Sequence, residues 1–311
     1  MKIDYRCKPS FIIMIRKLLL SIILNSFLIS QSTLSGLDSW THSSTIGLSG
    51  GGYLFSYQNE FRNAAMLVNS NRLFKLSLIK YPADINAQSV IANGILFNHH
   101  FGVSIKHISY GIFESRSSDN ILNGNFSASD THIQMAYAKF LYKDKLIFGL
   151  NNGLFLSQIE NSNAKAITVS PSLLLHTRRF SMGLTFQNHG RMIDSYEKTI
   201  EPLRGSIVFS IFKSLKNYPI EIELDQIIHQ GLKYNSYHLS ALYKTKNNIF
   251  IKGGMSSNRI HRIKSNQFID VLLSDVGMGV GYEFDNLIVD FNTYTYSNSN
   301  SIYGITIASK F

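Results

Sequence analysis

The side chains best suited to catalysis in this chain of 311 residues are histidines and serines. His176, His189, His238 and Ser240 are candidate parts of a hydrolase site. A working site needs a nucleophile, a base and an orienting group in contact, and no spacing here brings three such groups together. We therefore predict no catalytic residues and no enzymatic activity.

Metal and cofactor chemistry has equally little support. His99-His100 resembles a metal-binding pair, but adjacent residues on a strand point to opposite faces. The sequence contains no H-E-x-x-H, Cys/His cluster, G-x-S-x-G or phosphate-binding loop. We predict no metal site and no cofactor.

Three acids form one face of a possible strand. Glu221, Glu223 and Asp225 alternate with the apolar residues of 220–224. This alternation predicts a strand with one face in contact with water. The acids are either a cation-selecting stripe in a channel or the ordinary lining of a solvated barrel interior, and the second interpretation is the simpler.

The composition indicates the class of protein to which the chain belongs. Only 16% of the residues are charged, the formal net charge is +10, and Tyr and Phe number 16 and 21. The apolar content of 44% excludes disorder, and the single Cys excludes a disulfide scaffold. The sequence has no block of like charges that would favour nucleic-acid binding. Apolar residues spread thinly through an aromatic-rich chain are typical of a transmembrane β-barrel.

The N-terminus has the pattern of an export signal. Arg16-Lys17 precedes an apolar run over 18–29, and small residues follow over 30–36. We predict a signal peptide over 1–35, in which 1–13 is an upstream extension if Met14 is the true start. The alternative is a membrane anchor.

Beyond residue 72 the chain shows repeated runs with period-2 apolar spacing, bounded by Asn, Ser, Gly or Asp. The run 179–187 is among the clearest. Longer gaps alternate with short ones, as in outer-membrane barrels with long extracellular loops and tight periplasmic turns. We predict an all-β, antiparallel barrel over 73–311 with both chain ends in the periplasm and with about fourteen strands, at 73–80, 89–98, 100–110, 131–141, 144–157, 165–176, 179–188, 205–213, 219–227, 235–245, 248–256, 275–284, 286–296 and 302–311.

Two further segments fit an outer-membrane location. The last predicted strand ends on an aromatic residue, Phe311, which resembles the signal used in outer-membrane assembly. Residues 36–72 are too few for a domain, so we predict that they form a hatch inside the barrel. The glycines of 275–284 either mark a close approach of this hatch or are small lumen residues. A pocket between hatch and wall would be lined by Tyr53, Leu54, Phe55, Phe61 and Met66.

A family resemblance rests mainly on residues 108–130. Ile108-Ser109-Tyr110-Gly111-Ile112-Phe113 leads into Gly124-Asn125-Phe126-Ser127-Ala128-Ser129-Asp130, which resembles the PorV/PorQ family of outer-membrane barrels, its PorQ branch above all. Residues 63–67, with Ala64 in place of the family's usual proline, and Asn188-His189-Gly190 resemble the same family. The resemblance extends over about 45–311.

The resemblance implies a FadL-like barrel of fourteen strands with an N-terminal hatch. It also implies a non-catalytic role in the type IX secretion system, beside the sortase-like attachment complex that processes and anchors secreted cargo. Partners would be that complex, its sortase-like subunit, cargo C-terminal domains and outer-membrane lipid. The alternative function is a FadL-like channel for hydrophobic small molecules.

If the chain binds proteins, the long loops are the expected surface. The gaps 111–130, 189–204 and 257–274 are large enough to make an interface. Phe113, Phe126 and Tyr196 are the candidate anchors, because aromatic residues are enriched among interface residues that dominate affinity.

Overall fold

The computed structural model describes residues 34–55, 60–70, 72–177, 179–196, 203–230, 235–258, 274–296 and 300–311. The predicted signal peptide falls outside these residues except at its last two positions. Within the described residues, no helix is long and apolar enough to cross a membrane.

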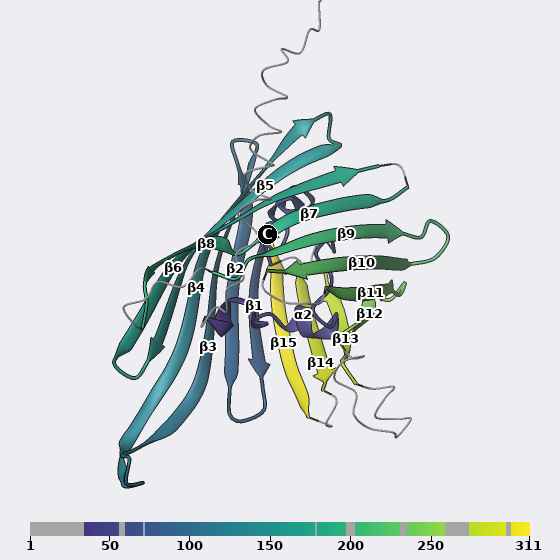
Figure 1. The fold of residues 1–311 in the computed structure, drawn as a ribbon. Coiled ribbons are helices and arrows are strands. Elements are labelled where there is room, and N and C mark those ends of the chain that lie inside the picture. Colours follow the sequence, from purple (N-terminus) through teal and green to yellow (C-terminus); the bar gives the residue numbers. More distant parts are fainter. Residues whose placement is uncertain are drawn as a thin grey trace, which may run out of the picture.

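The chain is built almost entirely of antiparallel strands (Figure 1). They are β1 (Leu73–Lys80), β2 (Asn86–Leu96), β3 (His99–Arg116), β4 (Leu122–Tyr142), β5 (Leu146–Ile159), β6 (Ser162–His176), β7 (Ser181–Gln187), β8 (His189–Asp194), β9 (Ser206–Ser214), β10 (Ile220–His229), β11 (Ser236–Lys244), β12 (Ile249–Ser256), β13 (Val276–Phe284), β14 (Leu287–Thr295) and β15 (Ser301–Lys310).

These elements form one closed barrel of fourteen strands, as the sequence predicts. Each strand pairs with its neighbours in the chain, β5 pairs with β6, and β1 pairs with β15 from Leu73↔Lys310 to Lys80↔Tyr303. β7 and β8 are two halves of one strand, interrupted at Asn188, whose φ of 54° breaks the extended conformation. Closure pairs the strands on both sides, as a lipid environment requires, except at β8, which among the described strands pairs with β6 alone.

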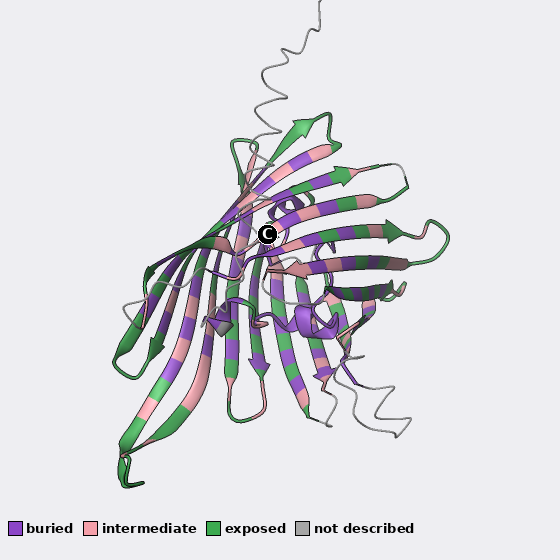
Figure 2. Cartoon of the chain, viewed as in Figure 1, coloured by how far each residue is buried: buried purple, intermediate pink, exposed green. Residues whose placement is uncertain are grey.

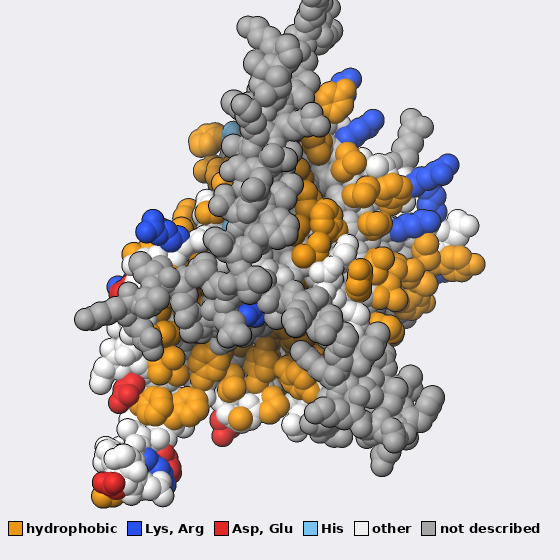
Figure 3. All heavy atoms as spheres, in the orientation of Figure 1, with side chains coloured by type: hydrophobic (Ala, Val, Ile, Leu, Met, Phe, Trp, Pro, Cys, Tyr) orange, Lys and Arg blue, Asp and Glu red, His pale blue; other side chains and the backbone are white. Residues whose placement is uncertain are grey.

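Buried and exposed residues alternate along the strands (Figure 2), so successive side chains point to opposite faces of the wall. Along β1 the outward residues Phe74, Leu76 and Leu78 are exposed, and along β15 so are Tyr303, Ile305 and Ile307. The inward residues include small, polar and charged types such as Ser77 and Thr306. Apolar side chains therefore cover much of the outer face visible in Figure 3, as expected for a surface in contact with lipid.

The N-terminal segment lies inside this barrel. It contains the 3-10 turns η1 (Ser35–Leu37) and η2 (Ala64–Asn69) and the short helix α2 (Ser43–Gly47). α2 contacts β12 to β15 and β1, whereas η2 contacts β3 to β6 on the other side of the lumen. We call the described residues of 34–70 the hatch; its residues 41–55 are all buried.

The two ends of the barrel differ in their connections. At one end, the turn rim, short connections include 97–98, where Phe97 and Asn98 have φ of 49° and 61°. Two successive positive φ angles match the twist of a tight hairpin. At the other end, the loop rim, connections include 81–85, 195–205 and 257–275.

Three of the predicted long loops are wrong in whole or in part; one of them, 189–204, begins with the strand β8. Most of the gap 111–130 is strand, because β3 and β4 continue as a hairpin that ends in a turn over 117–121. The gap 158–164 shrinks to the turn 160–161 between β5 and β6. The stretch 111–130 is rich in Ser, Asn and Gly and the stretch 158–164 contains Asn and Ser, which favour a loop. Backbone pairing nevertheless forms strands where a hairpin extends past the apolar band. Loop length therefore alternates less regularly than the sequence suggests.

Candidate functional site

The acidic stripe of β10 binds the hatch backbone. A Glu223 Oε1 oxygen accepts a hydrogen bond from the N–H of Leu54 at 2.8 Å, and Asp225 Oδ2 accepts one from the N–H of Gly52 at 2.9 Å. Ser210 on β9 donates to the second oxygen of Asp225. Both carboxylates are fully buried. The prediction of a solvated lining is therefore wrong at these two positions, and they form no open cation stripe either.

The neighbouring strand β11 holds the same stretch of hatch through its carbonyls. His238 Nδ1 lies 2.8 Å from the carbonyl oxygen of Ser49, and Ser240 Oγ donates to the carbonyl of Leu48 at 3.3 Å. These two side chains were candidate catalytic parts. In the structure both are used to fix the hatch.

Glycines in β12 and β13 let the hatch backbone approach the wall. A Cβ atom at Gly254 would collide with the backbone of Leu48, and one at Gly277 would collide with the backbone of Ile46. Gly279 and Gly281 instead face side chains of the wall. Of the two interpretations of this glycine row, close approach holds at Gly277.

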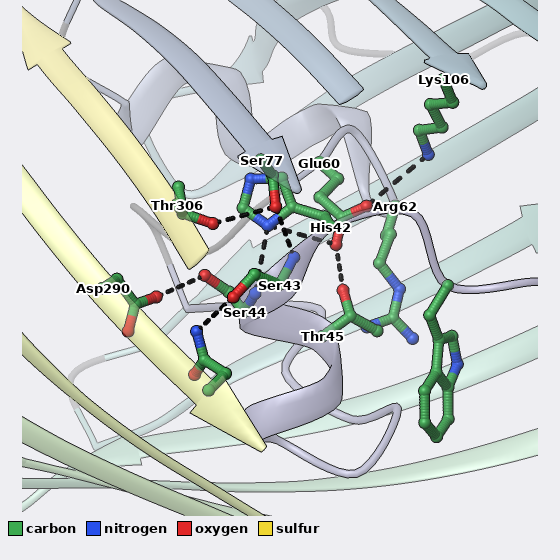
Figure 4. Close-up of polar contacts among 12 residues, drawn as sticks. His42, Ser43, Ser44, Thr45, Glu60, Arg62, Ser77, Lys106, Asp290 and Thr306 are labelled. Carbon is green, nitrogen blue, oxygen red and sulfur yellow. Dashed lines mark hydrogen bonds and ion pairs between the residues drawn. The ribbon is translucent and has the colours of Figure 1, made fainter. Parts of the chain in front are cut away.

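A cluster of buried charges links the hatch to the wall on β3. Glu60 lies 3.8 Å from Lys106 Nζ and 3.8 Å from His42 Nδ1, and it accepts a hydrogen bond from Thr45 (Figure 4). The guanidinium of Arg62 donates to the carbonyls of Gly50 and Gly51. It also stacks on the Tyr53 ring, with Cζ 3.7 Å from the ring centre.

The protonation states in this cluster follow from burial and charge. Burial lowers the pKa of His42 to about 4, so His42 is neutral at neutral pH. Burial alone would raise the pKa of Glu60, but the neighbouring His42, Lys106 and Arg62 outweigh it, and the pKa lies below its usual value. With His42 neutral, Lys106 and Arg62 carry that effect at neutral pH.

A second polar cluster fixes α2 against β14. Asp290 accepts hydrogen bonds from Ser44 Oγ at 2.8 Å and from the buried ammonium of Lys252 on β12. Asn292 Nδ2 donates to Ser43 Oγ at 2.6 Å, and the N–H of Ser43 donates to Ser77 Oγ at 2.7 Å. The two clusters together hold both ends of the helix-containing part of the hatch.

Space remains between the hatch and the loop rim. A chamber of about 240 Å³ is lined by Tyr53, Arg62 and Lys106 and by residues at the loop-rim ends of β9, β10 and β11, namely Ser206, His229 and Ser236. We call this space the loop-side chamber. Its lining is mixed in polarity, so it differs from the apolar pocket expected between hatch and wall.

The five residues predicted to line that pocket are all buried. Tyr53 lines the loop-side chamber and donates to Gln187 at 2.8 Å. Leu54 and Met66 pack with Ile147 and Leu174 of the wall. Phe55 packs with Leu48, Leu242 and Phe250, and Phe61 covers Gly102 of β3. These residues form apolar contacts of the hatch with different parts of the wall, not one shared pocket.

The three predicted protein-binding residues are divided between two places. Phe113 and Phe126 stack on the β3–β4 hairpin, with ring centres 5.4 Å apart. Tyr196 is partly buried against Leu34, Leu37 and neighbouring wall residues, and its hydroxyl meets Ser157. Only the phenylalanine pair lies on the hairpin.

The wall histidines that the sequence analysis considered for metal binding or catalysis have other contacts. His99 Nδ1 lies 2.8 Å from the Tyr137 hydroxyl, and His176 Nδ1 lies 2.8 Å from Ser181 Oγ. His189 lies beside Gln230. Within the described part of the chain, no three His, Cys, Asp or Glu residues are grouped to hold a metal ion.

Several residues of the chamber were not predicted. Glu60 and Arg62 are the only charged residues between 50 and 67, which is a signal of a buried pair. Lys106 falls on the lumen face of its strand. Trp40 is the only tryptophan of the chain. Their proximity depends on the hatch path, which the sequence does not reveal.

Comparison with known proteins supports the fold. No family model matches the sequence, and no curated protein matches it. The solved structure of the TodX deltaS2S3 mutant, a monoaromatic hydrocarbon channel, is similar with a TM-score of 0.59 at 11% identity, over 87% of this chain and 99% of that one.

Two further structures are similar to a comparable degree. The toluene transporter TodX of P. putida gives a TM-score of 0.54 at 11% identity, over 88% of this chain and 99% of that one. A Pseudomonas aeruginosa FadL homologue gives a TM-score of 0.54 at 10% identity, over 87% of this chain and 98% of that one. At such identities the similarity shows the fold alone: a FadL-like outer-membrane β-barrel of fourteen strands with its N-terminal segment inside.

Proposed function

We propose that this chain is an outer-membrane channel for small hydrophobic molecules and that the hatch closes it at rest. The observation that carries the proposal is the hatch itself: a closed barrel whose lumen is filled by its own N-terminal segment. The hatch is fastened to the wall by hydrogen bonds and ion pairs and by no covalent link along the described lumen. A closure of this kind can be displaced without unfolding the barrel.

The substrate class is supported by the apolar contacts of the hatch and by the structural neighbours. Leu54, Phe55, Phe61 and Met66 pack against the wall at separate points, so displacement of the hatch exposes apolar surface along the lumen. The loop-side chamber of about 240 Å³ exceeds a cavity of about 150 Å³ that holds benzene. The similar structures include a monoaromatic hydrocarbon channel and a toluene transporter.

A reversible lock on the hatch tests the proposal. In a Cys7→Ser background, the pair Ser43→Cys and Asn292→Cys places two thiols where the wild-type side chains are hydrogen-bonded. The protein is reconstituted in vesicles with lipopolysaccharide in the outer leaflet, which slows unassisted toluene entry, and the vesicles enclose a dye responsive to toluene. We expect toluene entry in the reduced state, its loss on oxidation, and its return on reduction; each single-cysteine variant is the control. Entry equal to that of protein-free vesicles in the reduced state would contradict the proposal.

A second candidate function, a subunit of the type IX attachment complex, is favoured by one observation. The β3–β4 hairpin extends far from the barrel (Figure 1) and carries the stacked Phe113 and Phe126, with Ile112 exposed nearby. Aromatic pairs on a projecting element are suited to protein contact.

This candidate is tested by purification of the tagged protein from native outer membranes in mild detergent. The expected result is recovery of a sortase-like protein that is lost in a Phe113→Ala, Phe126→Ala variant. The control is Phe97→Ala, which removes an aromatic residue that is 87% exposed at the opposite rim. Failure to recover any sortase-like protein, or equal recovery with the variant, would exclude this role.

A further inference from the structure

Four aromatic residues gather beside the hatch near the loop rim. Trp40 belongs to the hatch, Tyr81 to the connection after β1, Tyr294 to the end of β14, and Tyr296 lies just beyond it. The Trp40 and Tyr294 ring centres are 4.9 Å apart with planes at 88°, and those of Tyr294 and Tyr296 are 5.0 Å apart at 90°. Rings set at right angles form adjoining walls of a box.

The position of these rings is fixed by hydrogen bonds. The Tyr81 hydroxyl donates to the carbonyl of Trp40 at 2.6 Å, and the Tyr294 hydroxyl donates to Asp275. Tyr294 is buried, whereas the other three are partly exposed. Because the walls are tied to two different strands and to the hatch, the box is preorganised for a ligand.

The rings line a pocket of about 190 Å³, which we call the aromatic pocket. Its remaining lining is formed by Asp38, Ser39, Ser49, His238, Ser256 and Asn258. Within the described residues this lining includes one carboxylate and no Lys or Arg. Arg204 is the cation whose charge acts on Asp38, and it is not part of the lining.

The cations of the adjoining loop-side chamber are already engaged. Arg62 is bound to the carbonyls of Gly50 and Gly51 and to the Tyr53 ring, and Lys106 faces Glu60 at 3.8 Å. Both cations are therefore held by groups of the hatch, whereas the aromatic pocket offers electron-rich ring faces and a carboxylate.

We propose that the aromatic pocket binds a small organic cation of the quaternary ammonium class, with the ammonium among Trp40, Tyr81 and Tyr296 and its charge directed toward Asp38. Ring faces attract such cations through the ring quadrupole, and an aromatic box is a common way to recognise them. Because these residues lie inside the lumen, the ligand is a solute that enters from the loop rim and not a lipid of the surrounding bilayer. The proposal is independent of the transport of hydrophobic molecules.

The single tryptophan makes the pocket directly observable. Trp40 is the only Trp of the chain, so the intrinsic tryptophan fluorescence of the folded protein reports on this site alone. The protein in detergent is titrated with choline chloride, with sodium chloride at equal ionic strength, and with 3,3-dimethyl-1-butanol, the neutral carbon isostere of choline. We expect a saturable change in Trp40 fluorescence with choline only. Calorimetry is expected to give the same choline affinity.

Three variants locate the binding. Tyr296→Leu removes one ring face and is expected to weaken choline binding by about 5- to 30-fold, whereas Tyr296→Phe keeps the ring and stays close to wild type. Asp38→Asn weakens binding and reduces its dependence on salt. Heat-shifted migration in gels confirms that each variant retains a folded barrel.

The outcomes are separable from those of the transport assay. Binding of the neutral alcohol as tightly as choline would overturn the proposal, because the pocket would then select only an apolar group. The absence of saturable binding by both fluorescence and calorimetry, or unchanged affinity in Tyr296→Leu, would also overturn it. Toluene entry into vesicles is measured on the two Tyr296 variants, whose side chain does not line the loop-side chamber, and is expected to be unchanged.

Discussion

Asp225 on β10 accepts a hydrogen bond from the backbone N–H of Gly52 at 2.9 Å, although 173 residues separate them in the chain. The bond joins a buried carboxylate of the wall to a peptide group of the hatch. Both partners are removed from water, so neither has a solvent molecule to replace the other. The seating of the hatch therefore depends on a few such wall side chains.

Replacement of Asp225 by Ala is expected to loosen the hatch. The variant leaves the buried Gly52 N–H without this acceptor, at a cost of about 1–3 kcal/mol. The hatch should be displaced more often, and planar bilayers should show a higher conductance than with wild type. The control is Asp285→Ala, which removes an exposed acid from a turn. A closed-state conductance equal to that of wild type would show that the bond does not hold the hatch.

Gly277→Ala is expected to push the hatch away from β13 without unfolding the barrel. The added Cβ meets the backbone of Ile46 and Ser49, which cannot move aside as a flexible side chain can. Trypsin should then cleave after Arg62 faster than in the wild type, where this residue is half-buried beside the hatch backbone. Gly94→Ala is the matched control, because a Cβ there has no atom within 4 Å. Equal protection of Arg62 in both variants would count against the close approach.

The hatch is expected to lose stability in acid through His42. Its pKa falls from the usual 6.5 to about 4 on burial, so folding favours the neutral ring. The stabilisation is complete above about pH 6.5 and is lost as the pH falls toward about 4, by up to about 3 kcal/mol.

Hydrogen exchange of the α2 amides, corrected for intrinsic rates, measures this loss. Other acids titrate in the same range, so the informative quantity is the difference between wild type and His42→Gln. We expect this difference to change between pH 6.5 and 4. A difference that stays constant over that range would mean that His42 is not buried in its neutral form.

The Lys252–Asp290 pair is expected to be more sensitive to the loss of one partner than of both. Both side chains are buried, and removal of one leaves an uncompensated charge, which costs about 3–5 kcal/mol. Lys252→Met should therefore lower the urea midpoint of the vesicle-bound protein strongly. The double variant Lys252→Met, Asp290→Asn should recover much of the loss, because an Asn oxygen still accepts from Ser44. No recovery would indicate that Lys252 acts through packing alone.

The barrel could be predicted from the sequence because lipid imposes a simple pattern on it. Outward residues such as Leu76 and Ile305 must be apolar, and their neighbours face the lumen, so strands are visible as a period of two. The ends of β3 and β4 were missed because the pattern stops where the wall leaves the membrane. There the backbone still pairs, but the side chains no longer need to alternate.

The lumen was harder to predict than the wall. Glu223 and Asp225 were correctly placed on one face of a strand, yet their partners are peptide groups of the hatch. Every residue contributes a peptide group, so the sequence does not show which of them binds a side chain of the wall. The contacts between Trp40, Tyr294 and Tyr296 likewise depend on how the hatch crosses the barrel, and no local pattern encodes that path.

The wall holds much of the hatch by its peptide groups: Glu223 and Asp225 accept from N–H groups, while His238 and Ser240 donate to carbonyls. Such bonds do not involve the side chains of these hatch residues, although Gly52, with φ of 86°, leaves no room for one. In the channel proposed above, closure and selectivity would therefore be separable traits. Hatch side chains that face open lumen could then be exchanged to suit another solute, while the same wall residues continue to seat the hatch.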